Sequence, residues 1–204
     1  MNYLSKLITG FNINNQSTFF RTRQAFGNLD FRVDTRYNLA SVTKTITAVA
    51  LLQLLEKKNL SIEDKIWPYL PTDWNINNIR NVSFRQVLMH KAGFINDPPD
   101  ETYENIKRTI ENGVDLAWLG KHLYKNINYG ICRVLLAYLD GYTPSLQSNQ
   151  GKSTSDRFIQ YLQKNIFDPI AISGVSFKPG VSSSVALFYN YPFSIGGPGN
   201  DGGD

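Results

Sequence analysis

The sequence is poor in the residues that form cross-links and metal centres. Cys132 is its one cysteine, and only two histidines occur among 204 residues. A single cysteine excludes an internal disulfide and a cysteine-based metal cluster. Nothing in the sequence implies a metal or another cofactor.

Long hydrophobic runs and clusters of one charge are also missing. The most apolar stretch, residues 48–52, is far shorter than the roughly 18–20 residues that span a membrane. The first ten residues lack the apolar core of a secretory signal. We therefore expect no membrane span and a cytoplasmic location as written, or a periplasmic or secreted one if the N-terminus is incomplete. Basic residues exceed acidic ones by 21 to 17 without forming a run, which argues against a nucleic-acid partner.

The residues that are present predict a folded domain over residues 1–204. Aromatic residues make up 13% of the chain, which excludes wholesale disorder. Residues 7–37 mix aromatic and β-branched residues with polar ones and are expected to be extended, whereas residues 143–153 are expected to be a loop. Apolar spacing and capping residues predict helices at 46–55, 84–88, 100–112, 129–139 and 158–166.

The sharpest chemical feature is a serine and a lysine three residues apart, Ser41 and Lys44, before the apolar helix. This spacing places both side chains on one side of a helical turn. A serine hydroxyl needs a neighbouring base to become a nucleophile, and a lysine in a suitable environment can activate it. The alternative is structural: the serine caps the helix and the lysine is solvated. A tetrapeptide this short also occurs by chance about once in a chain of this length.

A tyrosine that could move protons occurs in two similar patterns. Tyr124 and Asn126 precede an apolar helix, and the same spacing recurs at Tyr103 and Asn105. A phenol beside a lysine can lose its proton more readily and then act as a base. We expect Tyr103 to lie on an exposed helix without a role, but the pattern alone does not choose between the two tyrosines.

Residues 39–48, which contain Ser41 and Lys44, closely resemble the nucleophile segment of the serine β-lactamase-related family. This family includes class C β-lactamases, D-alanyl-D-alanine carboxypeptidases and penicillin-recognising esterases. Further segments that resemble the family follow in the same order, so that the similarity spans about residues 20–180. They are residues 60–64, 69–71, 87–93, 124–129 and 166–171.

The resemblance implies a fold and a set of roles. The fold would be of the α/β (α+β) class, with an antiparallel sheet flanked by helices and a mainly helical lobe. Residues 1–64 and 151–204 would form the core and residues 65–150 the lobe. Ser41 would be the acylated nucleophile, with its backbone N–H as one oxyanion donor, and Lys44 would be its hydrogen-bonded activator. Tyr124 would be the general base or acid, and Asn126 would contact Lys44 and the substrate amide.

The same resemblance gives the other candidate residues no catalytic role. His90 falls on a structural turn of the family, and we interpret His122 and Cys132 as ordinary. The family's third motif, a lysine or histidine two residues before a glycine on a sheet strand, has no counterpart on an expected strand. The glycine pairs at 196–197 and 202–203 lack both the basic residue and the flanking strand. We therefore expect the chain to be the N-terminal two-thirds of such a protein.

These residues predict a serine hydrolase that works through a covalent acyl-enzyme on an ester, amide or β-lactam carbonyl. Its partner would be a small molecule or a peptide with a scissile carbonyl. The alternatives are a catalytically impaired or truncated member that binds penicillin or peptides, or an inactive fragment. The sequence carries no signal of the oligomeric state.

Overall fold

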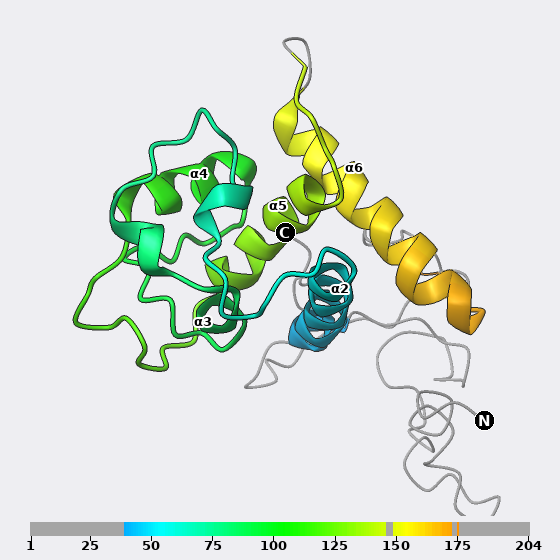
Figure 1. Cartoon of the computed structure of the whole chain (residues 1–204), viewed down its shortest axis with the longest axis horizontal. Coiled ribbons are helices and arrows are strands. Elements are labelled where there is room, and N and C mark those ends of the chain that lie inside the picture. The colour runs from blue at the N-terminus through cyan, green and yellow to red at the C-terminus, as the bar shows by residue number, and fades with distance from the viewer. Residues whose placement is uncertain (1–38, 146–148, 173–174, 176–204) are drawn as a thin grey trace, which may run out of the picture. The chain divides into compact units, whose positions relative to one another are not determined.

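The computed structural model describes residues 39–145, 149–172 and 175, nearly all of which belong to one compact unit, Ser41–Val175. Figure 1 shows this unit as a group of helices joined by loops and short turns. The α-helices are α2 (Thr43–Lys57), α3 (Phe84–Leu88), α4 (Tyr103–Asn112), α5 (Ile127–Leu139) and α6 (Gln150–Leu162). The short turns are η1 (Ala40–Val42), η2 (Trp67–Tyr69), η3 (Asn78–Asn81), η4 (Gln163–Phe167) and η5 (Asp168–Ile170).

The unit is organised around α5. This helix contacts α2, α3, α4 and α6, and Figure 1 shows it between α4 on the left and α6 on the right. Its apolar residues recur at helical spacing, and Ile127, Ile131 and Leu135 are fully buried. Burying apolar surface contributes about 25 cal/mol per Å² to the stability of a fold. The apolar contacts of α5 with the other four α-helices therefore stabilise the unit. Within the described residues, no helix is long and apolar enough to cross a membrane.

The expected antiparallel sheet is wrong for the part of the chain that the structure describes. Residues 39–145, 149–172 and 175 form no strand, and their extended pairing is limited to two isolated bridges, Lys65 with Ser83 and Phe94 with Val114. The physical reason is the local sequence, because these residues carry helix caps and apolar residues at helical spacing. The segment expected to be extended, residues 7–37, lies outside the described residues. The division into core and lobe stays a prediction.

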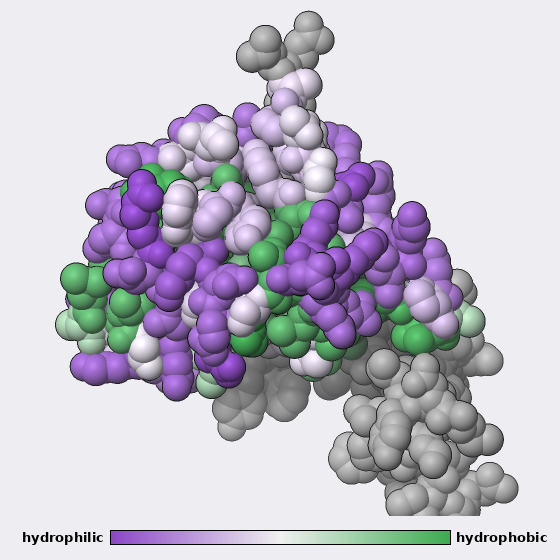
Figure 2. Space-filling model, viewed as in Figure 1, coloured by the Kyte–Doolittle hydropathy of each residue, from purple (hydrophilic) through white to green (hydrophobic). Residues whose placement is uncertain are grey.

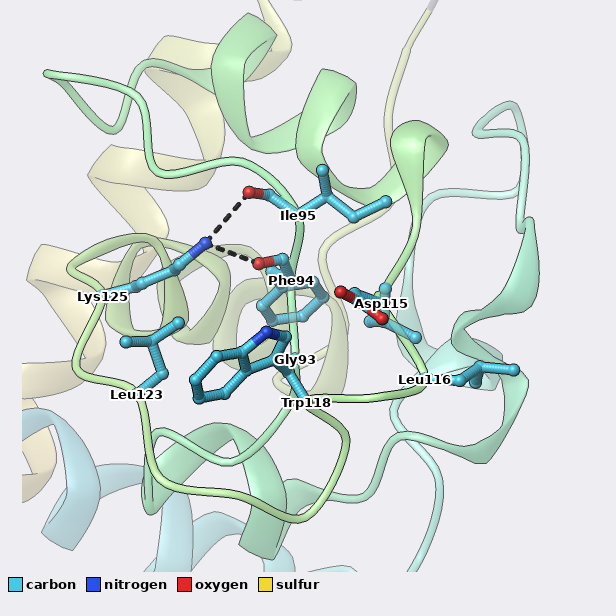
Figure 3. A pocket seen from close by; sticks show the side chains of 9 residues that line it. Gly93, Phe94, Ile95, Asp115, Leu116, Trp118, Leu123 and Lys125 are labelled. Carbon is cyan, nitrogen blue, oxygen red and sulfur yellow. Dashed lines mark hydrogen bonds between the residues drawn. The ribbon is translucent and has the colours of Figure 1, made fainter.

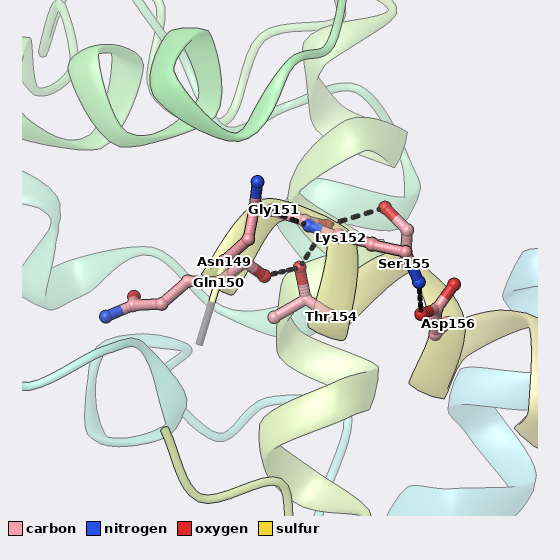
Figure 4. Close-up of polar contacts among 7 residues, drawn as sticks. All are labelled: Asn149, Gln150, Gly151, Lys152, Thr154, Ser155 and Asp156. Atoms are coloured by element: carbon pink, nitrogen blue, oxygen red, sulfur yellow. Dashed lines mark hydrogen bonds and ion pairs between the residues drawn. The ribbon is translucent and has the colours of Figure 1, made fainter. Parts of the chain in front are cut away.

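The last long helix, α6, begins inside the segment that we expected to be a loop. Asn149 caps it by accepting a hydrogen bond from the backbone N–H of Lys152 at 2.9 Å. Thr154 and Ser155 donate their hydroxyls to main-chain carbonyls one turn back, as Figure 4 shows. Short polar side chains favour loops in sequence-based reasoning because they compete for backbone hydrogen bonds. Here these bonds stay within the helix, so the composition of the segment was misleading.

Two shorter helices show how well local signals predict. The capping box that opens α3 is confirmed, since Ser83 and Gln86 exchange side-chain-to-backbone hydrogen bonds at 3.3 and 2.9 Å. Helix α4 also forms, but it is not the polar surface helix that we expected. One face of it is buried, including Ile106 and Ile110, and this face packs into the core around α5.

The chain after α3 makes a tight turn at Gly93, which has a φ of +73°. A Cβ atom at this position would lie 2.9 Å from the carbonyl oxygen of Asp115 and 2.9 Å from the backbone nitrogen of Leu119. Only glycine combines this backbone conformation with so close an approach of two chain segments. The turn therefore joins residues 90–95 to residues 113–120, the stretch that leads to Tyr124.

The surface of the unit is mixed. In Figure 2 polar side chains cover most of the visible face, with hydrophobic groups between them. Helix α2 contributes to this mixture, since Leu51 and Leu54 are fully buried whereas Val49 and Leu52 are each 42% exposed. The nearly uniform apolar composition of this helix predicts burial on every side. That prediction is wrong, because one side of α2 packs in the core and another is exposed.

Candidate active site

Ser41, Lys44, Tyr124 and Asn126 meet at the N-terminal end of α2. The Ser41 Oγ lies 2.8 Å from the Tyr124 Oη, and the Lys44 Nζ donates to the Ser41 Oγ at 3.2 Å. The Lys44 Nζ also donates to the Asn126 Oδ1 at 2.8 Å. The serine and the tyrosine are 83 positions apart in the sequence. The structure thus brings together all four residues that the sequence singled out.

The hydroxyl of Ser41 is not used to cap α2. The N-cap position is Val42, and no side chain donates or accepts a capping hydrogen bond there. Ser41 lies in the 3₁₀ turn η1 directly before the helix, where its Oγ faces the tyrosine and the lysine instead. The structural alternative for this serine, a helix cap beside a solvated lysine, is therefore wrong.

The loop that carries Tyr124 is held against the turn that follows α3. The backbone N–H of Leu123 donates to the His90 carbonyl at 2.8 Å. The Lys125 Nζ donates to the carbonyl oxygens of Phe94 and Ile95 at 2.7 and 2.9 Å, as Figure 3 shows. These bonds anchor both neighbours of the tyrosine, so its position relative to α2 is set by tertiary contacts rather than by local sequence.

A positive charge lies beside two aromatic rings in this site. The Lys44 Nζ is 5.1 Å from the ring centroid of Tyr124 and 5.8 Å from that of Tyr129, within the range of cation–π attraction. Interactions with the Lys44 side chain first, and with the Ser41 hydroxyl second, lower the pKa of the Tyr124 phenol below its usual value near 10. The tyrosine is half exposed, so solvent and small molecules can reach it.

The structure places the two tyrosines differently. Tyr103 is 8% exposed and donates its hydroxyl to Gln150 on α6, and its ring packs edge-on against Trp74. The expectation that this tyrosine lies on an exposed helix is wrong, because its ring is part of the core. Its hydroxyl is engaged in the interior, whereas that of Tyr124 contacts Ser41.

The two histidines and the cysteine lie in different surroundings. His90 lies on the turn with a φ of +54° and is 9% exposed. Cys132 is fully buried on α5, and burial raises the pKa of its thiol to about 12, which makes it a poor nucleophile. His122 is exposed, with its ring centroid 6.1 Å from that of His90. Across the described ranges, no group of three or more His, Cys, Asp or Glu side chains is arranged to hold a metal ion.

Sequence reasoning assigned His90 to a structural turn and missed its contact with the candidate base. The His90 and Tyr124 rings stack with centroids 4.4 Å apart and an interplanar angle of 28°. The two residues are far apart in the sequence, so no local pattern signals the stacking.

A cavity of about 590 Å³ adjoins the loop that carries Tyr124. Leu123 and Lys125, the two neighbours of this tyrosine, line it together with Ile95 and Trp118 (Figure 3). Leu123, Ile95 and Trp118 give the cavity a largely apolar wall beside the candidate site.

A protein-family model described as Beta-lactamase matches residues 14–187, most of the chain. The chain belongs to this beta-lactamase family. The family model spans both Ser41 with Lys44 and Tyr124 with Asn126, so the four contacting residues lie within the matched region.

Two curated relatives are distantly similar to this chain. Protein flp from Staphylococcus aureus (strain COL) is 22% identical over 182 residues, which are 81% of this chain and 34% of flp. A teichoic acid D-alanine hydrolase from Staphylococcus aureus is 23% identical over 112 residues, 53% of this chain and 28% of that protein. The chain thus spans about a third or less of the length of these two curated relatives.

One solved structure is similar to this chain in fold. The crystal structure of FmtA from Staphylococcus aureus matches with a TM-score of 0.51 and 20% sequence identity. The match covers 67% of this chain and 36% of the FmtA chain. At this identity the likeness concerns the fold alone.

Proposed function

We propose that this chain is a serine hydrolase of the beta-lactamase family in which Ser41 forms a covalent acyl-enzyme. The observation that carries this proposal is the pair of contacts to the Ser41 Oγ, one from the Lys44 Nζ and one from the Tyr124 Oη. A serine hydroxyl bonded at once to a cation and to a phenol of lowered pKa is the arrangement that an activated nucleophile requires.

The first half of the reaction forms the acyl-enzyme. The Tyr124 phenolate accepts the Ser41 hydroxyl proton as the Oγ bonds to the carbonyl carbon of the substrate. The backbone N–H of Ser41 donates to the oxyanion that develops on the carbonyl oxygen. As the tetrahedral intermediate collapses, the bond to the leaving group breaks and Tyr124 returns the proton to that group. Lys44 stays positively charged throughout and stabilises the phenolate.

The second half releases the acyl group. A water molecule gives a proton to the Tyr124 phenolate while its oxygen bonds to the acyl carbon. The bond to the Ser41 Oγ then breaks, and the serine takes the proton back from the tyrosine. Asn126 holds the Lys44 ammonium and can also hydrogen-bond an amide of the substrate.

The substrate class is an ester, amide or lactam carbonyl on a small molecule or a peptide. The teichoic acid D-alanine hydrolase among the relatives is named for hydrolysis, which supports a hydrolytic reaction over a transfer to another acceptor. An ester is the substrate that we favour, because it needs less activation of its leaving group than an amide.

A second candidate is a family member that is acylated but releases the acyl group slowly. It is considered because residues 1–204 offer no expected strand with the family's third motif, which supplies the second oxyanion donor in the family. Losing one such donor costs on the order of 3 kcal/mol of transition-state stabilisation. Such a protein would act as a penicillin-binding or peptide-binding protein.

The test is covalent labelling of the whole chain. We expect a fluorophosphonate probe to add one mass equivalent to the protein, read by intact mass spectrometry, with the adduct on the peptide that contains Ser41. A β-lactam probe followed over time separates the two candidates, since the adduct decays in a hydrolase and persists in a slow member. Absence of an adduct with both probes would contradict the proposal.

Replacing Tyr124 with phenylalanine tests the base. Phenylalanine retains a ring that can stack on His90 but removes the Oη that contacts Ser41. We expect labelling to slow by about 10²- to 10⁴-fold, the usual contribution of general acid–base catalysis. In the unaltered protein the labelling rate rises with pH through the lowered pKa of the phenol, because the phenolate is the form that accepts the proton. The variant loses this rise.

The matched control is Tyr129→Phe. Tyr129 also lies beside the Lys44 ammonium, but its hydroxyl donates to the Leu88 carbonyl at 3.1 Å and not to Ser41. We expect this variant to be labelled at close to the unaltered rate and to keep the pH dependence. Equal slowing in both variants would assign the effect to general packing rather than to the Tyr124 hydroxyl.

A further inference from the structure

His90 contacts Tyr124 and both of its neighbours. The His90 ring stacks on the tyrosine ring at 4.4 Å, and its carbonyl oxygen accepts the Leu123 N–H at 2.8 Å. Its Nδ1 accepts the backbone N–H of Lys125 at 3.3 Å. His90 thus binds the backbone of both residues that flank Tyr124, through its own carbonyl oxygen and its imidazole. The same imidazole stacks on the Tyr124 ring.

His90 is itself firmly placed. It is 9% exposed and adopts the left-handed backbone conformation just after α3. Its ring lies 5.3 Å from that of Tyr129, whose hydroxyl donates to the Leu88 carbonyl. Tyr124 therefore stacks on the His90 imidazole, which is held by the end of α3 and by the first turn of α5. The position of the Tyr124 Oη therefore depends on the position of the turn at His90.

The hydrogen bond from Lys125 sets the protonation form of His90. A nitrogen that accepts a backbone N–H carries no proton, so neutral His90 must carry its proton on Nε2. Protonation at Nδ1 would place two N–H groups against each other and remove the bond to Lys125. It would also add a positive charge beside the stacked Tyr124 ring.

The charged and titratable groups around His90 act in both directions. Burial lowers the pKa of His90 most, and the nearby Lys44 of α2 and His122 lower it further. The negative charge of Asp97 opposes this lowering. Tyr124 and Tyr129, the remaining titratable groups packed on the ring, are phenols. The neutral imidazole is therefore the form present at neutral pH.

We infer that His90 is a positioning residue for Tyr124, whose neutral ring holds the loop so that the Oη reaches Ser41. Protonation of the imidazole releases the Lys125 N–H and loosens the loop. The catalytic consequence rests on the proposed function of Ser41 and Tyr124, whereas the tautomer and the contacts do not. The structure thus assigns to this turn a role in acid sensitivity as well as in folding.

The tautomer can be read on the unaltered chain without any activity. The chain has two histidines, so ¹⁵N–¹H correlation of the imidazole nitrogens gives two spin systems, and His122→Gln identifies the other as His90. We expect an unprotonated Nδ1 and a protonated Nε2 at pH 8, with a pKa below the ordinary value of a histidine because the ring is buried. A proton on Nδ1 at pH 8, or a pKa at or above the ordinary histidine value, would overturn the inference.

Two variants test the link to the site. His90→Asn places an amide oxygen near the position of Nδ1 and tolerates the left-handed backbone, while His90→Gly keeps the backbone and loses the acceptor. At pH 8 we expect labelling of the asparagine variant within about threefold of the unaltered rate and labelling of the glycine variant at least about tenfold slower. As the pH falls through the titration midpoint of His90, the unaltered chain loses a component of the rate that the asparagine variant lacks.

The outcomes separate this inference from the proposed function. If the unaltered chain is not labelled, the proposed function fails, and the tautomer measurement still decides the state of His90. If the chain is labelled but the glycine variant matches the asparagine variant, the positioning role fails while the nucleophile stands. The positioning role also fails if the labelling rate of the asparagine variant falls at low pH as much as that of the unaltered chain. A glycine variant that does not fold leaves the decision to the tautomer and to the pH profile of the asparagine variant.

Discussion

Ser41→Ala removes covalent labelling of the chain and lowers hydrolysis of an ester substrate by roughly 10⁶-fold, the size of loss seen when a serine hydrolase lacks its nucleophile. The reason is that the alanine side chain has no oxygen to bond to the carbonyl carbon, while Lys44, Tyr124 and Asn126 remain. Ser41 is exposed and does not cap α2, so its removal leaves the helix intact. Intact mass after incubation with a fluorophosphonate measures the result directly.

The matched control for this variant is Thr45→Ala, which removes a hydroxyl from an exposed position one turn further along the same helix. We expect it to be labelled at the unaltered rate. Thermal unfolding of both variants should follow that of the unaltered chain, since surface substitutions usually change stability by less than about 0.5 kcal/mol. An undiminished adduct on Ser41→Ala would mean that another residue is the nucleophile.

Lys44→Met slows labelling by about 10²- to 10⁴-fold, because it removes the cation that contacts Ser41 and favours the Tyr124 phenolate. Methionine has similar length and flexibility but no charge. Without the ammonium, the pKa of the tyrosine rises toward its ordinary value. The rising limb of the pH–rate profile therefore moves to higher pH, and the loss is greatest near neutral pH. Rates measured from pH 6 to pH 10 show this shift.

Lys44→Arg separates the charge of the lysine from proton transfer. Arginine keeps the positive charge but does not release a proton in proteins. We expect it to restore part of the rate relative to methionine, because in the proposed mechanism Lys44 acts as a fixed cation. Labelling as slow as in Lys44→Met, with a well-folded protein, would instead make the lysine the base. Lys58→Met, at the far end of α2, controls for loss of positive charge.

The helices of this protein follow closely from local sequence, with one instructive error. Apolar spacing predicted α2 and α5 to within three residues at each end, and the capping residues placed the start of α3. The start of α6 was missed because Asn149, Thr154 and Ser155 are typical loop residues. In the folded chain Asn149 caps the helix, and Thr154 and Ser155 donate to carbonyls one turn back. The same side chains could instead hydrogen-bond the backbone in a loop, so the local sequence allows two hydrogen-bonding patterns. Packing of α6 against α5 favours the helical pattern.

The candidate site was predictable only in part. Ser41 and Lys44 stand three positions apart, so their proximity follows from the geometry of one helical turn. The partner tyrosine did not follow in this way, because Tyr103 and Tyr124 occupy identical patterns. The family resemblance favoured Tyr124, and the hydrogen bonds of the described residues agree with it. The contact of His90 with this tyrosine had no sequence signal.

The sequence by itself determined the helical elements of the described unit, the residue types of the candidate nucleophile and the family to which the chain belongs. These depend on spacings of a few residues or on ordered motifs, which are local properties. Only the tertiary structure decided which tyrosine faces Ser41, that the serine hydroxyl is free of the helix cap, and that His90 supports the loop of Tyr124. Those facts depend on contacts between segments that are 34 to 83 positions apart, and such contacts form only when α5 brings α2 and the turn after α3 together.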